Sequence, residues 1–216
     1  MLKKALPLAV MLALASTPVL ASTQSDAELI KATQAQAKEG DADAQVRMAL
    51  YYAGEDTLDY EKTRYWAEQS AAQGNTEGMT ILATLYRMGF GVDIDMEKAF
   101  KWELQAAEAD HPGSQASVAW HYYNGEGVQN DAAQAMAWAQ RAAINGDADG
   151  YAFAGRMLID GEGEGLVHNP ALGLAYMYQS KALGYEDAAE EIAHLEAQLS
   201  NRIVNAGRAA AEAWQN

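Results

Sequence analysis

The side chains with the greatest potential for chemistry are the histidines and two neighbouring serines. No histidine belongs to H-E-x-x-H or to another metal-binding spacing, and the chain has no cysteine that could complete a zinc site or act as a nucleophile. Scattered loop or surface positions are the favoured interpretation of the four histidines: His111, His121, His168 and His194. No G-x-S-x-G elbow surrounds Ser114 or Ser117, so neither has a context for activation. The sequence therefore predicts no catalytic residue, no metal site and no cofactor.

Two further segments resemble ion-binding loops without meeting their requirements. Residues 161–165 alternate glycine with glutamate, but the glutamates repel phosphate and no P-loop lysine follows. Acidic residues alternate over residues 93–97 as at the start of a calcium loop, but Lys98 occupies the place of the EF-hand glycine. We interpret the first segment as an extended loop, and Asp95 as the N-cap of a helix.

The charge balance limits the kind of partner. The 216 residues include 15 basic and 30 acidic side chains, which gives a formal net charge of −15. A negatively charged surface repels phosphate backbones and anionic membranes, so nucleic acid is not expected as a partner. Half of the residues are hydrophobic, which is too many for a disordered chain.

The first 21 residues have the pattern of a secretory signal peptide. Lys3 and Lys4 precede an apolar stretch over residues 5–15, which is far shorter than the roughly 20 residues of a membrane span. Pro18 breaks this stretch, and small residues then favour cleavage after Ala21. Cleavage leaves 13 basic and 30 acidic residues, a net charge of −17, on a soluble periplasmic or secreted protein without membrane insertion. An uncleaved membrane anchor is the alternative.

A pattern of about 36 residues occurs four times after this segment. Its first part has three columns, at spacings that place them on one face of a helix. The columns are a small residue (Ala44, Gly78, Ser114, Gly150), an apolar residue four positions later (Met48, Leu82, Val118, Ala154) and a large residue four further on (Tyr52, Tyr86, Tyr122, Leu158).

The second part of each copy predicts another helix. It has an N-cap (Asp59, Asp95, Asp131, Asn169), an aromatic residue (Trp66, Trp102, Trp138, Tyr176) and an end residue (Gly74, Asp110, Gly146, Gly184). Glycine at the end residue adopts the left-handed conformation that closes a helix, and Asp110 can still tolerate it. One helical hairpin cannot bury its apolar face alone, so the four copies must stack.

The repeated motif resembles that of Sel1-like repeats, A-x-x-x-L-G-x-x-Y-x-x-G-x-G-V followed by D-x-x-K-A-x-x-W-x-x-x-A-A-x-x-G. The best copy spans residues 78–110, with Leu82, Tyr86, Asp95 and Trp102 in place. The resemblance implies an all-α fold, an α/α solenoid of stacked helical hairpins related to tetratricopeptide arrays, with helical caps at both ends. We predict a signal peptide (1–21), an N-terminal capping helix (22–40), four Sel1-like repeats (41–185), and a C-terminal half-repeat with a capping helix (186–216).

By analogy with tetratricopeptide arrays, the first helix of each repeat lines the concave side of the solenoid. The groove-facing positions lie two and five residues after the apolar column, here called positions +2 and +5. Trp, Tyr and Arg dominate binding hot spots, and arginine can anchor a carboxylate or a backbone carbonyl. The predicted partner-binding residues are Leu50, Thr84, Arg87, Trp120, Tyr123 and Arg156; Ala53 and Ile159 complete the two columns. The alternative is that Trp120 packs on a neighbouring hairpin and that the arginines pair with local acids.

The sequence and the resemblance together predict a non-catalytic protein–protein interaction module, an adaptor or regulator that binds a peptide or helix segment of another protein. One alternative is a hydrolase of cell-wall or β-lactam substrates, which has been proposed for some Cys-rich relatives. The absence of cysteine and of an activatable nucleophile argues against that enzyme. A structural part of an envelope or motor assembly is the other alternative, and the oligomeric state stays open.

Overall fold

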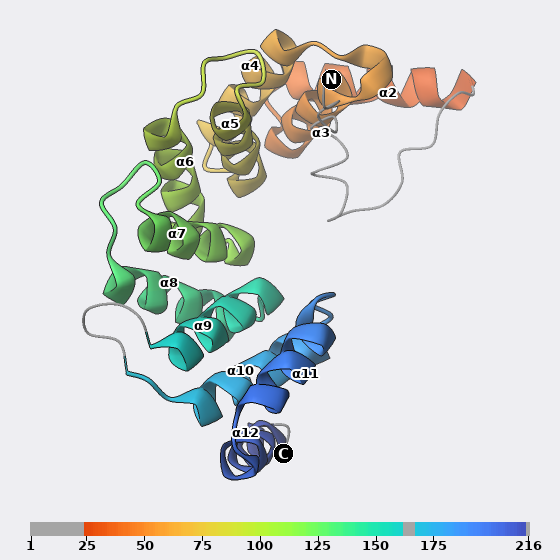
Figure 1. Cartoon of the computed structure of the whole chain (residues 1–216). Coiled ribbons are helices and arrows are strands. Elements are labelled where there is room, and N and C mark those ends of the chain that lie inside the picture. The colour runs from red at the N-terminus through yellow and green to blue at the C-terminus, as the bar shows by residue number, and fades with distance from the viewer. Residues whose placement is uncertain (1–23, 162–166, 215–216) are drawn as a thin grey trace, which may run out of the picture. The chain divides into compact units, whose positions relative to one another are not determined.

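The computed structural model describes residues 24–161 and 167–214, and every regular element within these ranges is helical (Figure 1). The predicted signal peptide and its cleavage site lie outside the described residues, as does most of the glycine- and glutamate-rich loop. The chain forms two compact units, which divide between Ala106 and Ala107 inside one helix. The predicted fold class, an all-α solenoid of stacked helical hairpins, is confirmed.

The first unit consists of consecutive helices that pack side by side. They are α2 (Gln24–Lys38), α3 (Ala42–Ala53), the short 3₁₀-helix η2 (Glu55–Thr57), α4 (Tyr60–Ala71), α5 (Thr76–Met88) and most of α6 (Met96–Glu108). Helix α3 packs against α2 on one side and α4 on the other, and α4 packs against α5. Helices α3 and α5, which begin successive repeats, also contact each other directly.

The second unit repeats this arrangement. It contains α7 (Pro112–Asn124), α8 (Ala132–Ile144), α9 (Ala148–Asp160), α10 (Pro170–Ala182), α11 (Ala188–Gln198) and α12 (Asn201–Trp214). Helix α9 packs between α8 and α10, and α7 contacts α9, which is again a contact between the first helices of two repeats. Helices α11 and α12 both pack on α10 at the C-terminal end of this unit.

Side chains at the predicted N-caps fix where the second helix of each repeat begins. Asp59, Asp95, Asp131 and Asn169 each accept a hydrogen bond from the backbone N–H three residues later, at 2.9–3.1 Å. These bonds satisfy N–H groups that have no partner inside the helix. The predicted helix ends are also confirmed, since Gly74, Gly146 and Gly184 have positive φ and the exceptional Asp110 has a φ of 62°.

The small residues of the repeat let neighbouring helices approach each other closely. A Cβ atom added at Gly173 of α10 would lie 2.6 Å from the carbonyl oxygen of Gly155 in α9, and one added at Gly155 would lie 2.9 Å from the carbonyl oxygen of Gly173. The same holds at Gly150, where an added Cβ would come within 2.8 Å of the backbone nitrogen of Ala143. The helices therefore meet backbone to backbone at these positions, and side chains fill the remaining space.

The predicted apolar column is buried, and the large and aromatic columns are buried or half-buried. In the apolar column, Met48, Leu82, Val118 and Ala154 are all fully buried. Of the aromatic residues, Trp66 is buried, whereas Trp102 and Trp138 are half-buried and pack against clusters of buried alanines and larger apolar residues. Burial of these residues supplies the main stabilisation of each hairpin stack.

The expectation that all four histidines occupy loops or the surface was wrong for His121. Its imidazole is fully buried, and its Nδ1 lies 2.6 Å from the backbone carbonyl oxygen of Glu126, to which Nδ1–H donates. The equivalent residues of two other repeats, Leu85 and Met157, are also buried, so this position belongs to the core. His111 has a structural role as well, because its Nδ1 accepts the N–H of Ser114 and caps α7.

One polar cluster ties α12 to α10 and α11. Arg208 of α12 forms a 2.7 Å ion pair with Glu196 of α11 and donates to the hydroxyl of Tyr178 in α10 at 3.0 Å. The Tyr178 hydroxyl donates in turn to Glu196. The hydrogen bond from Tyr178 and then the guanidinium of Arg208 lower the pKa of the Glu196 carboxyl. The cluster fixes α12 on the end of the second unit.

Candidate protein-binding surface

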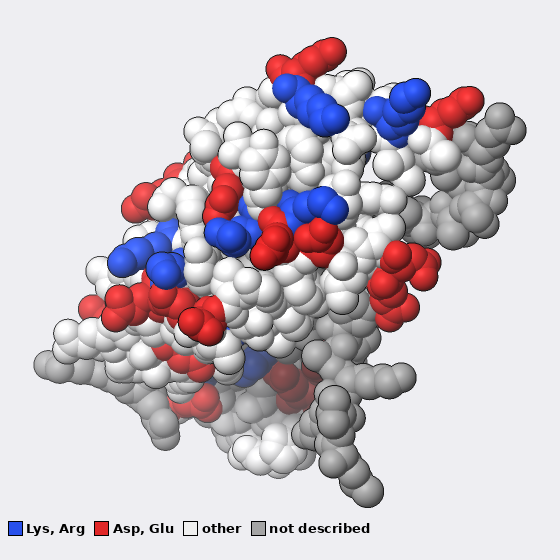
Figure 2. All heavy atoms as spheres, turned by 90° about the horizontal axis from the view of Figure 1, so that it is seen from above, with Lys and Arg blue, Asp and Glu red and all other residues white. Residues whose placement is uncertain are grey.

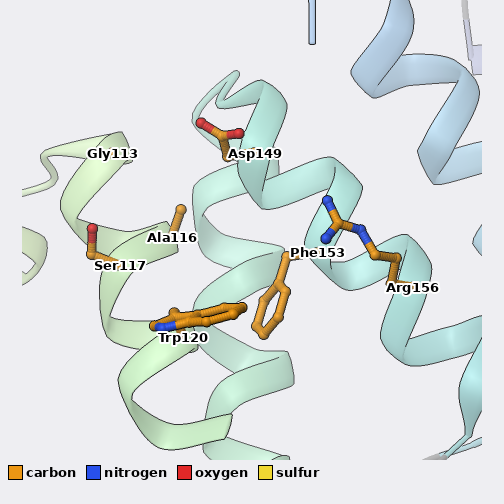
Figure 3. Close-up of a pocket in the computed structure, with 7 residues that line it drawn as sticks. All are labelled: Gly113, Ala116, Ser117, Trp120, Asp149, Phe153 and Arg156. Atoms are coloured by element: carbon orange, nitrogen blue, oxygen red, sulfur yellow. The ribbon is translucent and has the colours of Figure 1, made fainter. Parts of the chain in front are cut away.

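The first helices of the third and fourth repeats enclose an open hollow with a volume of about 240 Å³ (Figure 3). We call it the aromatic hollow. Helix α7 contributes four of its lining residues and α9 contributes three: Gly113, Ala116, Ser117, Trp120, Asp149, Phe153 and Arg156. All of them lie in the second unit.

The hollow exists because small and large side chains face each other across α7 and α9. Gly113, Ala116 and Ser117 leave the space empty on α7, one and two helical turns before Trp120. The Trp120 indole is 47% exposed, and its ring centroid lies 6.0 Å from that of Phe153 at a tilt of 51°. Tyr123 supports Phe153 from α7 with an edge-to-face contact at 5.4 Å. The aromatic wall is therefore ordered by ring contacts and still presents an open indole face.

The charged side chains of the hollow are not equally free. The Nε atom of Arg156 lies 3.2 Å from Glu191 Oε2, and its Nη2 donates to the hydroxyl of Tyr185 at 2.8 Å. Asp149 is exposed and forms no ion pair with any residue that the structure describes. Asp147, which caps α9 by accepting the N–H of Gly150, is partly buried, and this burial raises the pKa of its carboxyl.

The first unit has a hollow at the corresponding place on its repeats, with a volume of about 460 Å³. It lies between α3 and the start of α5 and is lined by Asp43, Val46, Arg47, Leu50, Asn75, Thr76 and Glu77. The four lining residues of α3 hold the same repeat positions as the four lining residues of α7 in the aromatic hollow. Counted from the apolar column, these are positions −5, −2, −1 and +2. This hollow has no aromatic lining residue, so the two sites differ in chemistry.

The six predicted partner-binding residues are not equivalent in the structure. Trp120 and Arg156 line the aromatic hollow and Tyr123 supports it, whereas Leu50 lines the hollow of the first unit. Thr84 is only 6% exposed, and its hydroxyl donates to the carbonyl oxygen of Thr80 at 2.9 Å.

Position +5 contributes less surface than position +2. Ala53 and Ile159 are buried, and only Arg87 and Tyr123 of this column are half-buried. Arg87 forms no ion pair within the described ranges, 24–161 and 167–214. The alternative that the arginines pair with local acids therefore holds for Arg156, through Glu191, and not for Arg87.

Sequence reasoning missed Phe153, the central residue of the aromatic wall. Phe153 lies one residue before the apolar column, here called position −1. Position −1 precedes position +2 by three residues and so shares its helix face. The column reads Arg47, Ile81, Ser117 and Phe153, and its variation in size was a signal that could have been found.

Basic side chains do not gather into a patch on the face that Figure 2 shows, where they lie beside acidic ones. Ion pairs such as Lys62–Asp59 at 2.7 Å and Lys98–Asp95 at 3.1 Å are consistent with this mixture of charges. Within the described part of the chain, no group of three potential ligands could hold a metal ion, and no helix is long and apolar enough to cross a membrane.

Stacked helical hairpins of this kind define an α/α repeat protein. The family model described as Sel1 repeat matches residues 42–75, 76–111, 112–147 and 148–185, which together make up two thirds of the chain. The chain therefore belongs to the Sel1 repeat family. Sel1 repeat proteins are generally protein–protein interaction modules and typically non-catalytic scaffolds.

Two proteins of known structure are among those similar to this chain. One is c5321, a protective antigen present in uropathogenic Escherichia coli strains that displays an SLR fold (27% identity, TM-score 0.70, 76% of this chain and 35% of that chain). The other is a Sel1 repeat protein from Oxalobacter formigenes (24% identity, TM-score 0.67, 78% of this chain and 49% of that chain). The chain thus spans about a third and about half of these two proteins. No curated protein matches it significantly.

Proposed function

We propose that this protein is a non-catalytic adaptor or regulator that binds a peptide or helix segment of a partner protein on the face formed by the first helices of its repeats. The aromatic hollow is the centre of that face in the second unit. The observation that carries the proposal is the open indole of Trp120, which lies beside an empty space instead of being packed away in the core.

Stacking of the hairpins does not require tryptophan at this position. The equivalent residues of the other repeats are Leu50, Thr84 and Arg156. A Trp side chain buries up to ~250 Å², so covering its exposed 47% would remove roughly 100 Å² from water. At about 25 cal/mol per Å², this burial is worth roughly 2.5 kcal/mol before the entropic costs of association are subtracted, which is enough for a hot-spot residue.

We further propose that the protein acts in the periplasm or after secretion. Two features support this location. Residues 1–21 have the basic start, short apolar stretch and small cleavage-site residues of a secretory signal. In the described residues that follow, no helix has the length and apolar character of a membrane span.

Site-specific photocrosslinking in cells that naturally make the protein tests the proposal. The photoreactive residue p-benzoylphenylalanine replaces Ser117, which lines the aromatic hollow, or Ile144, which is 83% exposed outside the hollow and serves as the control. We expect a discrete crosslinked species from position 117 only, and its loss when Trp120→Ala is added. Equal crosslinking from both positions, or none from position 117, would contradict the proposed binding face.

A further inference from the structure

The aromatic hollow carries one uncompensated negative charge. The guanidinium of Arg156 is neutralised by Glu191 at 3.2 Å and is held in place by the hydroxyl of Tyr185 at 2.8 Å. Asp149 remains as an exposed carboxylate on the rim, without an ion-pair partner among the described residues. Glu191 therefore offsets the charge of Arg156, which weakens the attraction of this guanidinium for a partner's carboxylate.

The shape of the hollow selects one large side chain. Its volume of about 240 Å³ equals that of roughly eight water molecules in the liquid, which is enough for a side chain and too little for a helix. Trp120 and Phe153 form an apolar wall, while Ala116 and Ser117 leave the opposite side open. An aromatic or large aliphatic side chain fits this space, because it can cover the exposed indole without leaving a buried polar group unpaired.

The start of α9 offers no site for a partner's anion. Asp147 already accepts the N–H of Gly150 at 2.7 Å, and Asp149 places a second carboxylate in the first turn of the helix. These carboxylates offset the positive end of the helix dipole and repel a further negative charge. The net charge of −15 on the whole chain acts in the same direction.

We infer that the partner segment carries a lysine or arginine next to an aromatic or large aliphatic side chain, the cation pairing with Asp149 and the apolar group lying on Trp120 and Phe153. This inference rests on the proposed function, because it names the chemistry of the segment that the same face binds. Charge complementarity favours this basic and apolar segment over an acidic one.

Selection from a phage-displayed library of random 12-residue peptides tests the inference on the purified full chain. Asp149→Asn is compared with Asp160→Asn, which removes another exposed acid at the other end of α9 and controls for the general attraction of basic peptides. We expect the peptides that depend on Trp120 to combine a basic residue with an aromatic or large aliphatic one. Their affinity should fall about fivefold in Asp149→Asn and stay within about twofold in Asp160→Asn.

A second variant tests the role assigned to the ion pair. Glu191→Gln removes the partner of Arg156 and leaves the hollow without net charge. We expect the selected basic peptides to bind about fivefold more weakly to this variant, and acidic peptides to be excluded less strongly.

The outcomes separate this inference from the proposed function. Peptides that depend on Trp120 but are acidic or neutral would overturn the inference and leave the binding face intact. Equal losses in Asp149→Asn and Asp160→Asn, or no peptide that depends on Trp120, would also overturn it. The proposed function fails independently, if crosslinking from position 117 finds no partner.

Discussion

Replacement of Gly173 by alanine tests how closely the helices of the fourth repeat approach each other. Helix propensity alone favours alanine over glycine inside a helix by about 1 kcal/mol. The structure predicts that alanine destabilises the protein at this position. The new Cβ would lie 2.6 Å from the carbonyl oxygen of Gly155 and 2.5 Å from Cγ1 of Ile159.

The expected loss follows from which atoms are in the way. The carbonyl oxygen of Gly155 belongs to the backbone of α9 and cannot rotate aside, so α9 and α10 must separate. Overpacking of this kind costs about 1–3 kcal/mol, and we take a value near 3 because both the backbone and the stem of Ile159 are too close. Subtracting the gain in propensity leaves a net destabilisation of about 2 kcal/mol.

Urea unfolding followed by far-UV circular dichroism measures this change, with Gly113→Ala as the matched control. At Gly113, which is also helical, the nearest atom to an added Cβ is on the ring of His111 at an ordinary 3.5 Å. The control should therefore be unchanged or more stable by up to about 1 kcal/mol. A Gly173→Ala protein as stable as the wild type would refute the described contact between α9 and α10.

Three further predictions concern stability. Trp66→Ala should lower the free energy of unfolding by about 3–5 kcal/mol, because the indole is only 7% exposed; a urea titration showing less than 1 kcal/mol would contradict its place in the core. Asp131→Ala should cost about 1 kcal/mol through loss of the N-cap, whereas Asp131→Asn should retain most stability in the same titration. Tyr178 and Arg208 lower the pKa of the Glu196 carboxyl in the folded protein. The ionised carboxylate should therefore stabilise the fold above about pH 4.3, the pKa of Glu in an unfolded chain, and this stabilisation should be lost as the pH falls towards the lower pKa of the folded state. Unfolding midpoints between pH 7 and pH 3 should therefore fall less in Glu196→Gln than in the wild type, and parallel curves would contradict the assignment.

The features that the sequence predicted well depend on residues close together in the chain. An N-cap such as Asp131 bonds to a backbone N–H only three residues away, so its type and position are sufficient to identify it. The left-handed conformation of Asp110 follows in the same way from its place at the end of the second helix, where the other repeats have glycine. The columns of small and apolar residues were recognisable because each one recurs in every repeat.

The binding face was harder to predict, because its contacts join different repeats. Arg156 was expected to be free to bind a partner, but it pairs with Glu191, which lies in the helix after the fourth repeat. Thr84 occupies a predicted groove position and is nevertheless buried. Phe153 belongs to no motif, and the variable size of its column does not show by itself that its ring lies beside that of Trp120. Exposure and pairing of this kind depend on the three-dimensional neighbour and not on local sequence.

The way in which repeats share the aromatic hollow has a consequence for how such proteins diversify. Trp120 at position +2 of the third repeat meets Phe153 at position −1 of the fourth. Arg156, at position +2 of the fourth repeat, likewise meets a residue of the following helix, Glu191 of α11. Tandem duplication of the third repeat would place the tryptophan of the first copy opposite a serine, since Ser117 holds position −1 in that repeat, whereas the tryptophan of the second copy would still face Phe153. Binding specificity therefore depends on the contacts between neighbouring repeats. Recombination that changes the order of intact repeats can create or remove a binding site without changing the sequence of any repeat.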